Sequence, residues 1–138
     1  DVANPFVPPD ALGRAMTAAS KDDRIQVHVM VQFLASYHYV ARAMGIEDLR
    51  DLIPVTPLAD CCSAAVKEGG KPMVMVLPNT RQEPEMIEIE TVIREAREKL
   101  LNAGILVYER LKDALKALAA VSAYQERKTA MLAAEEGP

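Results

Sequence analysis

Residues 100–125 constrain the fold of this chain more than any other stretch. Asn102-Ala103-Gly104 is typical of a helix end, because glycine adopts the left-handed C-cap conformation without steric cost. Ile105-Leu-Val-Tyr108 is a continuous apolar run, as in a strand covered on both faces. Apolar residues then recur at helical spacing, at Leu111, Ala114, Leu115, Leu118 and Val121. A helix, a strand and a helix joined by so few residues predict the closing αβα unit of a parallel sheet.

Two further strands are predicted, at 26–33 and 73–77, and together with 105–108 they make three. A fourth at 3–7 would lie at a sheet edge or strand end, because its prolines cannot donate to a central ladder. Strands that alternate with helices require crossovers and a parallel sheet. We therefore predict an α/β fold: one three-layer, flavodoxin-like domain over 1–138 with a small, mostly parallel sheet of three or four strands.

The helices between these strands are predicted from their start and stop residues. Asp10 and Ser36 are the expected N-caps of two helices, and Thr56 followed by Pro57 is the expected start of a third. Asn79 to Pro84 reads as a polar loop. The predicted helices cover 11–21, 36–44, 56–69, the segment after Pro84 to about 102, and 111–128, and a flexible tail is expected at 129–138.

Composition excludes several classes of function. The chain has 138 residues with a formal net charge of -4 and interspersed signs, so it has no basic face for nucleic acid or for a lipid surface. It contains no signal-peptide pattern and no apolar run that could span a membrane, and we expect a cytoplasmic protein. Because the sequence starts at Asp1 without Met, we expect a piece of a longer multidomain chain.

The only cysteines, Cys61 and Cys62, are adjacent. A disulfide between neighbours closes a strained ring, so two reduced thiols that help to pack a helix are the favoured interpretation. Soft-metal binding or a redox switch is the alternative. No metal-ligand spacing occurs in the chain, and no metal site is predicted.

In open parallel sheets, ligands bind beyond the carboxyl ends of the strands. Gln32, Ser36 and Asn79 occupy those positions, and they are our candidates for contact with a ligand or a neighbouring domain. No glycine-rich phosphate loop follows a strand, and no catalytic residue is predicted. His28 lies inside a strand, where a structural role is expected. His38 lies in the first turn of a helix at the ligand edge, where a structural role and contact with a ligand or partner both remain open.

In this order, the segments resemble the succinyl-CoA-ligase-like domain of NDP-forming acyl-CoA synthetases. Asn4-Pro5 precedes a helix, and Asp22-Asp23-Arg24-Ile25 leads into a strand, as at the start of that domain. Lys71-Pro-Met-Val-Met-Val-Leu77 is similar to the family's K-P-V-V-V-V strand. Asn102 to Tyr108, followed by an Ala/Leu-rich helix that ends near Tyr124-Gln-Glu-Arg-Lys128, is similar to its closing segment. The resemblance covers about residues 3–128.

The resemblance implies a flavodoxin-like domain inside an enzyme that joins an acid to CoA at the expense of a nucleoside triphosphate, through a phosphohistidine carried on another domain. It implies CoA, ATP or ADP, and Mg in the parent enzyme, with none of them bound by this domain. It implies CoA-binding, ligase-like and ATP-grasp domains or subunits as partners. The isolated domain is expected to be inactive, and a homodimer is compatible with the sequence.

The chain departs from the family pattern at three places. Phe6-Val-Pro-Pro9 stands where an aspartate and a small turn usually follow Asn-Pro, and Leu34-Ala-Ser36 replaces a Gly-Gly turn. The family's first strand is missing upstream, and by the usual order it would lie between the strands at 26–33 and 73–77. Two alternatives therefore stay open: a regulatory or scaffold domain fused to a protein acetyltransferase, and a stand-alone flavodoxin-like protein that binds a small ligand.

Overall fold

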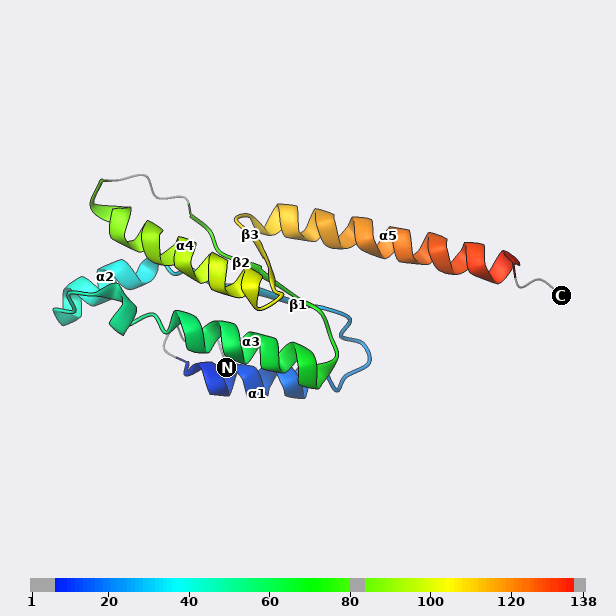
Figure 1. Cartoon of the computed structure of the whole chain (residues 1–138), viewed down its shortest axis with the longest axis horizontal. Helices are drawn as coiled ribbons and strands as arrows, with labels where there is room; N and C mark the ends of the chain where they lie inside the picture. The colour runs from blue at the N-terminus through cyan, green and yellow to red at the C-terminus, as the bar shows by residue number, and fades with distance from the viewer. Residues whose placement is uncertain (1–6, 80–83, 136–138) are drawn as a thin grey trace.

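The computed structural model describes residues 7–79 and 84–135, and in these ranges the chain forms five α-helices and a three-stranded sheet (Figure 1). Short 3-10 helices lie at Leu49–Asp51 and Pro84–Met86. The main elements in chain order are α1 (Pro9–Ala19), β1 (His28–Val31), α2 (Ser36–Met44), α3 (Val55–Gly69), β2 (Met73–Val76), α4 (Ile87–Asn102), β3 (Leu106–Tyr108) and α5 (Leu111–Glu135).

The sheet confirms the predicted α/β class with a small parallel sheet. Its order is β1-β2-β3, all parallel, with Val31 opposite Val76 and Val76 opposite Tyr108. β1 pairs directly with β2, so the gap that we expected for a missing family strand is not there. The expected strand at 3–7 falls on residues 3–6, which lie outside the described ranges, and on Val7, which is not in a strand.

Alternating residues of β2, together with Leu77 just after it, define the layers of the domain. Met73, Met75 and Leu77 belong to the main hydrophobic cluster with residues of α1, α3 and α4, whereas Val74 and Val76 pack with Ala114 of α5 on the opposite face. Successive side chains of a strand point to opposite faces, so the sheet has helices on both sides. The domain is therefore three-layered, with α1, α3 and α4 on one face and α5 on the other (Figure 1).

The predicted N-caps of the first three helices were wrong by one or two residues. α1 is capped by Pro8, and Asp10 lies inside its first turn, where it pairs with Arg14 at 2.6 Å. α2 is capped by Ala35, and α3 begins at Val55, before Thr56. Asp, Ser and Thr fit both the N-cap and the first turn of a helix, so the sequence alone does not separate the two positions.

The predicted helix ends are confirmed where glycine must adopt a positive φ. Gly45 follows α2 with φ +69° and Gly70 follows α3 with φ +66°. Gly104 lies between α4 and β3 with φ +82°. The last helix differs from the prediction, because α5 continues to Glu135 through residues 129–135, where we expected a flexible tail. This stretch is rich in alanine and contains no glycine or proline, so nothing in it ends a helix.

A small hydrogen-bonded joint connects the ends of three elements. The buried Ser20, just after α1, donates its hydroxyl to the Met16 carbonyl oxygen at 3.0 Å. His28, the first residue of β1, places Nε2 2.7 Å from Ser20 Oγ. The imidazole donates in this second bond when Nε2 carries the proton and accepts when it does not. His28 is thus a hydrogen-bonded structural residue, as expected, and Gly69 at the end of α3 leaves the space that Ser20 occupies.

Candidate functional site

The carboxyl edge of the sheet holds two of the three predicted contact residues on neighbouring strands. Gln32 follows β1 directly and its backbone N–H donates to the Val76 carbonyl oxygen at 3.0 Å. Asn79 follows β2 by three residues, just past Leu77, whose N–H donates to the Tyr108 carbonyl oxygen at 2.8 Å. Both side chains are half-buried. The sequence therefore predicted their place correctly, although no hydrogen bond joins the two side chains.

Ser36 lies in the first turn of α2 and is exposed. Its hydroxyl donates to the Phe33 carbonyl oxygen at 2.7 Å, and its backbone N–H donates to the same oxygen at 3.1 Å. The side chain therefore stabilises the tight turn between β1 and α2. The hydroxyl proton is used in this hydrogen bond, but the hydroxyl oxygen can still accept hydrogen bonds.

His38 is buried, with 8% of its surface exposed, and its Nε2 has no hydrogen-bond partner. Its ring meets that of Tyr39 edge-on, with centroids 5.6 Å apart and an interplanar angle of 80°. Asn79 Oδ1 is likewise buried without a partner. A buried polar atom without a hydrogen bond typically costs about 1–3 kcal/mol, and most such atoms are paired. In the described ranges, both such side-chain atoms lie on segments that follow the carboxyl ends of β1 and β2.

The buried face of α2 includes polar side chains. Val40, Ala41 and Met44 are the apolar residues in the second half of this helix, but the buried residues are Tyr37, His38 and Ala41, and Met44 is exposed. Burial raises the pKa of the Tyr37 phenol. Residues 37, 38 and 41 also share one face of a helix. If a polar residue is allowed on the buried face, this spacing predicts that His38 points inward. The spacing is visible in the sequence, but the sequence does not show that the His38 side chain is buried.

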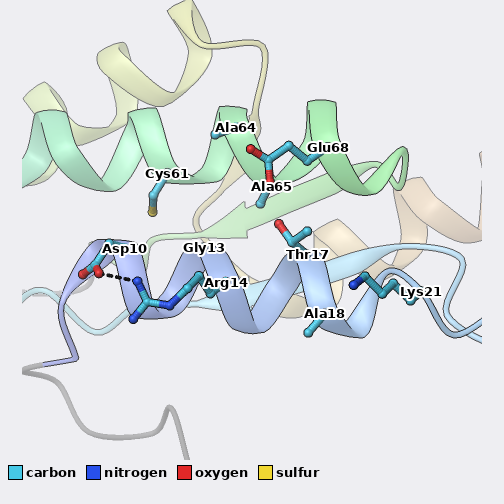
Figure 2. Close-up of a pocket in the computed structure, with 10 residues that line it drawn as sticks. All are labelled: Asp10, Gly13, Arg14, Thr17, Ala18, Lys21, Cys61, Ala64, Ala65 and Glu68. Atoms are coloured by element: carbon cyan, nitrogen blue, oxygen red, sulfur yellow. Dashed lines mark hydrogen bonds and ion pairs between the residues drawn. The ribbon is translucent and has the colours of Figure 1, made fainter.

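A groove of about 300 Å³ lies between α1 and α3 (Figure 2). Its charged lining residues are Asp10, Arg14, Lys21 and Glu68, two of each sign. A Cβ placed at Gly13 would lie 3.4 Å from the Cβ of Cys61, which is an ordinary van der Waals contact between the two helices. Figure 2 shows Arg14 turned along its own helix towards Asp10. With balanced charges and its arginine paired internally, this groove is a packing seam with no preference for an anion or a cation.

The two cysteines do not form a joint site. Cys62 is fully buried in the main cluster, whereas Cys61 is half-buried and lines the groove. Cys61 donates to the Leu58 carbonyl oxygen at 3.2 Å. The pKa of Cys61 is lowered mainly by the thiol of Cys62, and the pKa of Cys62 is raised by Cys61 and by burial. Successive residues on a helix point about 100° apart, so the pair serves core and groove separately.

The described part of the chain contains no metal site and no membrane-spanning helix. Across residues 7–79 and 84–135, no group of three or more His, Cys, Asp or Glu side chains is arranged to hold a metal ion. None of the helices in that part of the chain is long and apolar enough to cross a membrane. In open α/β sheets, ligand crevices form where the strand order reverses. The described strands run in consecutive order, without such a reversal.

Comparison with protein-family models, with curated proteins and with solved structures finds no match for this chain. What defines its class is therefore the fold itself: an α/β domain with a three-stranded parallel sheet and helices on both faces.

Proposed function

We propose that this chain is a non-catalytic, ligase-like domain of an NDP-forming acyl-CoA synthetase. In this proposal the carboxyl edge of the sheet packs against a neighbouring domain that carries the phosphohistidine. The segment order, and above all the helix, glycine, strand and helix at 100–125, supports the family. The observation that carries the role is the pair of buried polar atoms, His38 Nε2 and Asn79 Oδ1, that have no partner at this edge.

Both atoms are buried within this chain, so docking of a neighbouring domain must shift the segments that follow β1 and β2 before a partner can pair with them. The Asn79 oxygen accepts a hydrogen bond, and the imidazole nitrogen donates or accepts one according to its tautomer. A backbone segment offers both an N–H and a carbonyl oxygen, so it can satisfy either atom. Gln32 and Ser36 flank them with further polar groups. The cost of leaving the atoms unpaired then favours the assembled enzyme over the separate domain.

The same edge is poorly suited to chemistry of its own. A nucleophilic hydroxyl requires a base within hydrogen-bond reach, but the Ser36 hydroxyl donates to the Phe33 carbonyl oxygen. We therefore place CoA, the nucleotide and Mg on the other domains of the parent enzyme, which we expect to act in the cytoplasm. This chain's contribution is to position the interface and to exclude water from it.

The neighbouring domains provide the first test. The gene that encodes this chain should also encode a CoA-binding or ligase-like domain, and a gene without either would refute the proposal. The purified 138-residue chain, given ATP, Mg, CoA and a panel of short acids, should form no acyl-CoA and no phosphohistidine. Turnover by this chain alone would equally refute the proposal.

The second test measures the interface directly. The neighbouring domains are expressed separately, and their binding to this chain is measured by calorimetry. His38→Ala and Asn79→Ala should each weaken binding by about 5- to 150-fold, as expected for the loss of one buried hydrogen bond worth about 1–3 kcal/mol. Glu68→Gln, near the opposite end of α3, is the matched control and should leave binding unchanged. Unchanged binding in both edge variants, with intact circular dichroism, would contradict the proposed interface.

A further inference from the structure

α5 is much longer than the sheet on which it begins. Its 25 residues span about 37 Å at the usual helical rise, whereas a four-residue strand spans about 13 Å. Ala114 is fully buried against Val74 and Val76, and Leu118 packs beside them. Beyond that point the helix leaves the body of the domain, as Figure 1 shows. We call residues 119–134 the arm: all of them are exposed except the half-buried Ala123.

The arm exposes several large apolar side chains to solvent. Its large apolar side chains are 51–66% exposed, and they are Val121, Tyr124, Met131 and Leu132. The steps from 121 to 124 and on to 131 keep these residues on one helical stripe. Charge is confined to Glu126, Arg127 and Lys128, while the rest is mainly alanine and apolar. A contiguous exposed apolar surface of this kind is typical of a site that packs against another apolar surface.

The sheet leaves an uncovered surface of the matching kind. Val29 and Val31 on β1 are 36% exposed, and Phe33 just after β1 is 64% exposed. Their cross-strand neighbours on β2, Val74 and Val76, are buried under α5. α5 packs on β2 and β3, so the β1 column on that face stays open. We call these three residues the open strip.

We propose that a second copy of this chain covers the open strip: the arm of each copy packs across the strip of its partner in a two-fold symmetric dimer. The arm is an exposed apolar helix, and the open strip is an apolar sheet surface without a helix over it. Each is therefore the kind of surface on which the other can pack. Within one copy they do not meet, because α5 starts over β2 and β3 and carries the arm away from the domain. A two-fold axis pairs each arm with a strip twice over, which is the self-complementary arrangement of an isologous dimer.

The area agrees with this occupant. The strip and the arm together hold seven large apolar side chains, each about one third to two thirds exposed. A side chain of this size at half exposure carries on the order of 100 Å² of apolar surface, which gives roughly 700 Å² per copy. Stable interfaces bury about 800 Å² per partner, whereas a monomer's largest apolar patch is about 300–600 Å². The dimer is independent of the proposed enzyme family, and its test does not require the neighbouring domains.

Sedimentation equilibrium of the purified chain, from about 1 to 200 μM, measures the proposed dimer. The expected mass is twice the monomer mass of 15.1 kDa. The arm variant Val121→Glu/Met131→Glu and the strip variant Phe33→Ser should each raise the dimer dissociation constant by more than about tenfold, because they place polar groups in the apolar contact. Ile87→Glu alters an equally exposed apolar residue at the start of α4, outside both surfaces, and should leave the dissociation constant unchanged.

A mixing experiment separates this dimer from one in which two arms pair with each other. The strip variant has an intact arm and the arm variant has an intact strip, so a mixture of the two restores one of the two contacts. The mixture should therefore form more heterodimer than either variant forms homodimer. A wild-type chain that stays monomeric to about 200 μM would overturn the proposal. So would a strip variant that dimerises as tightly as wild type, because only arm-to-arm pairing predicts that result.

Discussion

We predict that Gly69→Ala destabilises the fold. Gly69 lies at the end of α3, where helix propensity alone would favour alanine. Propensity alone predicts that Gly→Ala stabilises a helix by about 0.5–1 kcal/mol. A Cβ at Gly69, however, would lie 2.6 Å from the Cβ of Ser20. Ser20 is held in place by its bond to Met16 and by the imidazole of His28. The substitution must therefore shift the end of α1 or break this joint.

The magnitude follows from opposing terms. Overpacking a well-filled site typically costs about 1–3 kcal/mol, and a lost buried hydrogen bond costs about 1 kcal/mol more. After the gain in helix propensity, Gly69→Ala should lower the free energy of unfolding by about 1–3 kcal/mol. Gly13→Ala is the matched control in α1, because its Cβ would lie 3.4 Å from that of Cys61, an ordinary contact. That variant should be more stable than wild type by about 0.5–1 kcal/mol.

Urea unfolding monitored by circular dichroism measures both changes. With a slope of about 1–3 kcal/mol per molar, the midpoint of Gly69→Ala should fall by roughly 1 M, while the midpoint of Gly13→Ala should rise. In a Ser20→Gly background the obstructing side chain is gone, so the cost of Gly69→Ala should become smaller. The reasoning is refuted if Gly69→Ala is as stable as wild type, or if its cost is the same in both backgrounds.

Two further predictions concern ionisable groups. Cys61 is half-buried and its pKa is lowered, whereas Cys62 is fully buried with a raised pKa. Iodoacetamide should therefore label Cys61 alone in the folded chain and both cysteines in urea, as read by mass spectrometry; labelling of Cys62 in the native state would contradict its burial. Arg50 bonds Glu95 at 2.6 Å and 3.1 Å and holds the pKa of that carboxyl below its usual range. A lowered carboxyl pKa adds stability above the unfolded-state pKa, and this is lost as the pH falls through the folded-state pKa. The difference in urea midpoint between wild type and Arg50→Gln should thus be present at neutral pH and vanish in acid; a difference that persists in acid would show that the guanidinium acts through packing.

The sequence was most reliable where one pattern had a single structural solution. The uninterrupted run at 73–77 could be only a strand buried on both faces, and β2 is that strand. Gly104 was predicted to end a helix because glycine adopts a positive φ at low cost, and its backbone has that conformation. Gln32 and Asn79 were placed at the carboxyl edge because strand ends alone decide that position.

The sequence was least reliable where the outcome depends on distant contacts. Local chemistry did not reveal that β1 pairs directly with β2, because pairing over 45 residues is a property of the whole sheet. The burial of His38 depends on what packs over α2, and helical periodicity allowed a different inward face. The continuation of α5 past 128 is a case in which intrinsic helix propensity was decisive after all.

The unequal size of the two hydrophobic clusters has a consequence for cooperativity. The main cluster joins β1, β2 and β3 to the helices of one face, whereas the second has only Val74, Val76 and Ala114 as buried members. Local opening costs free energy in proportion to the apolar contact that is broken. α5 can therefore detach from the sheet while the rest of the domain stays folded, so its amide hydrogens exchange with solvent through a low-energy local opening. The domain thus behaves as two thermodynamic units within one fold.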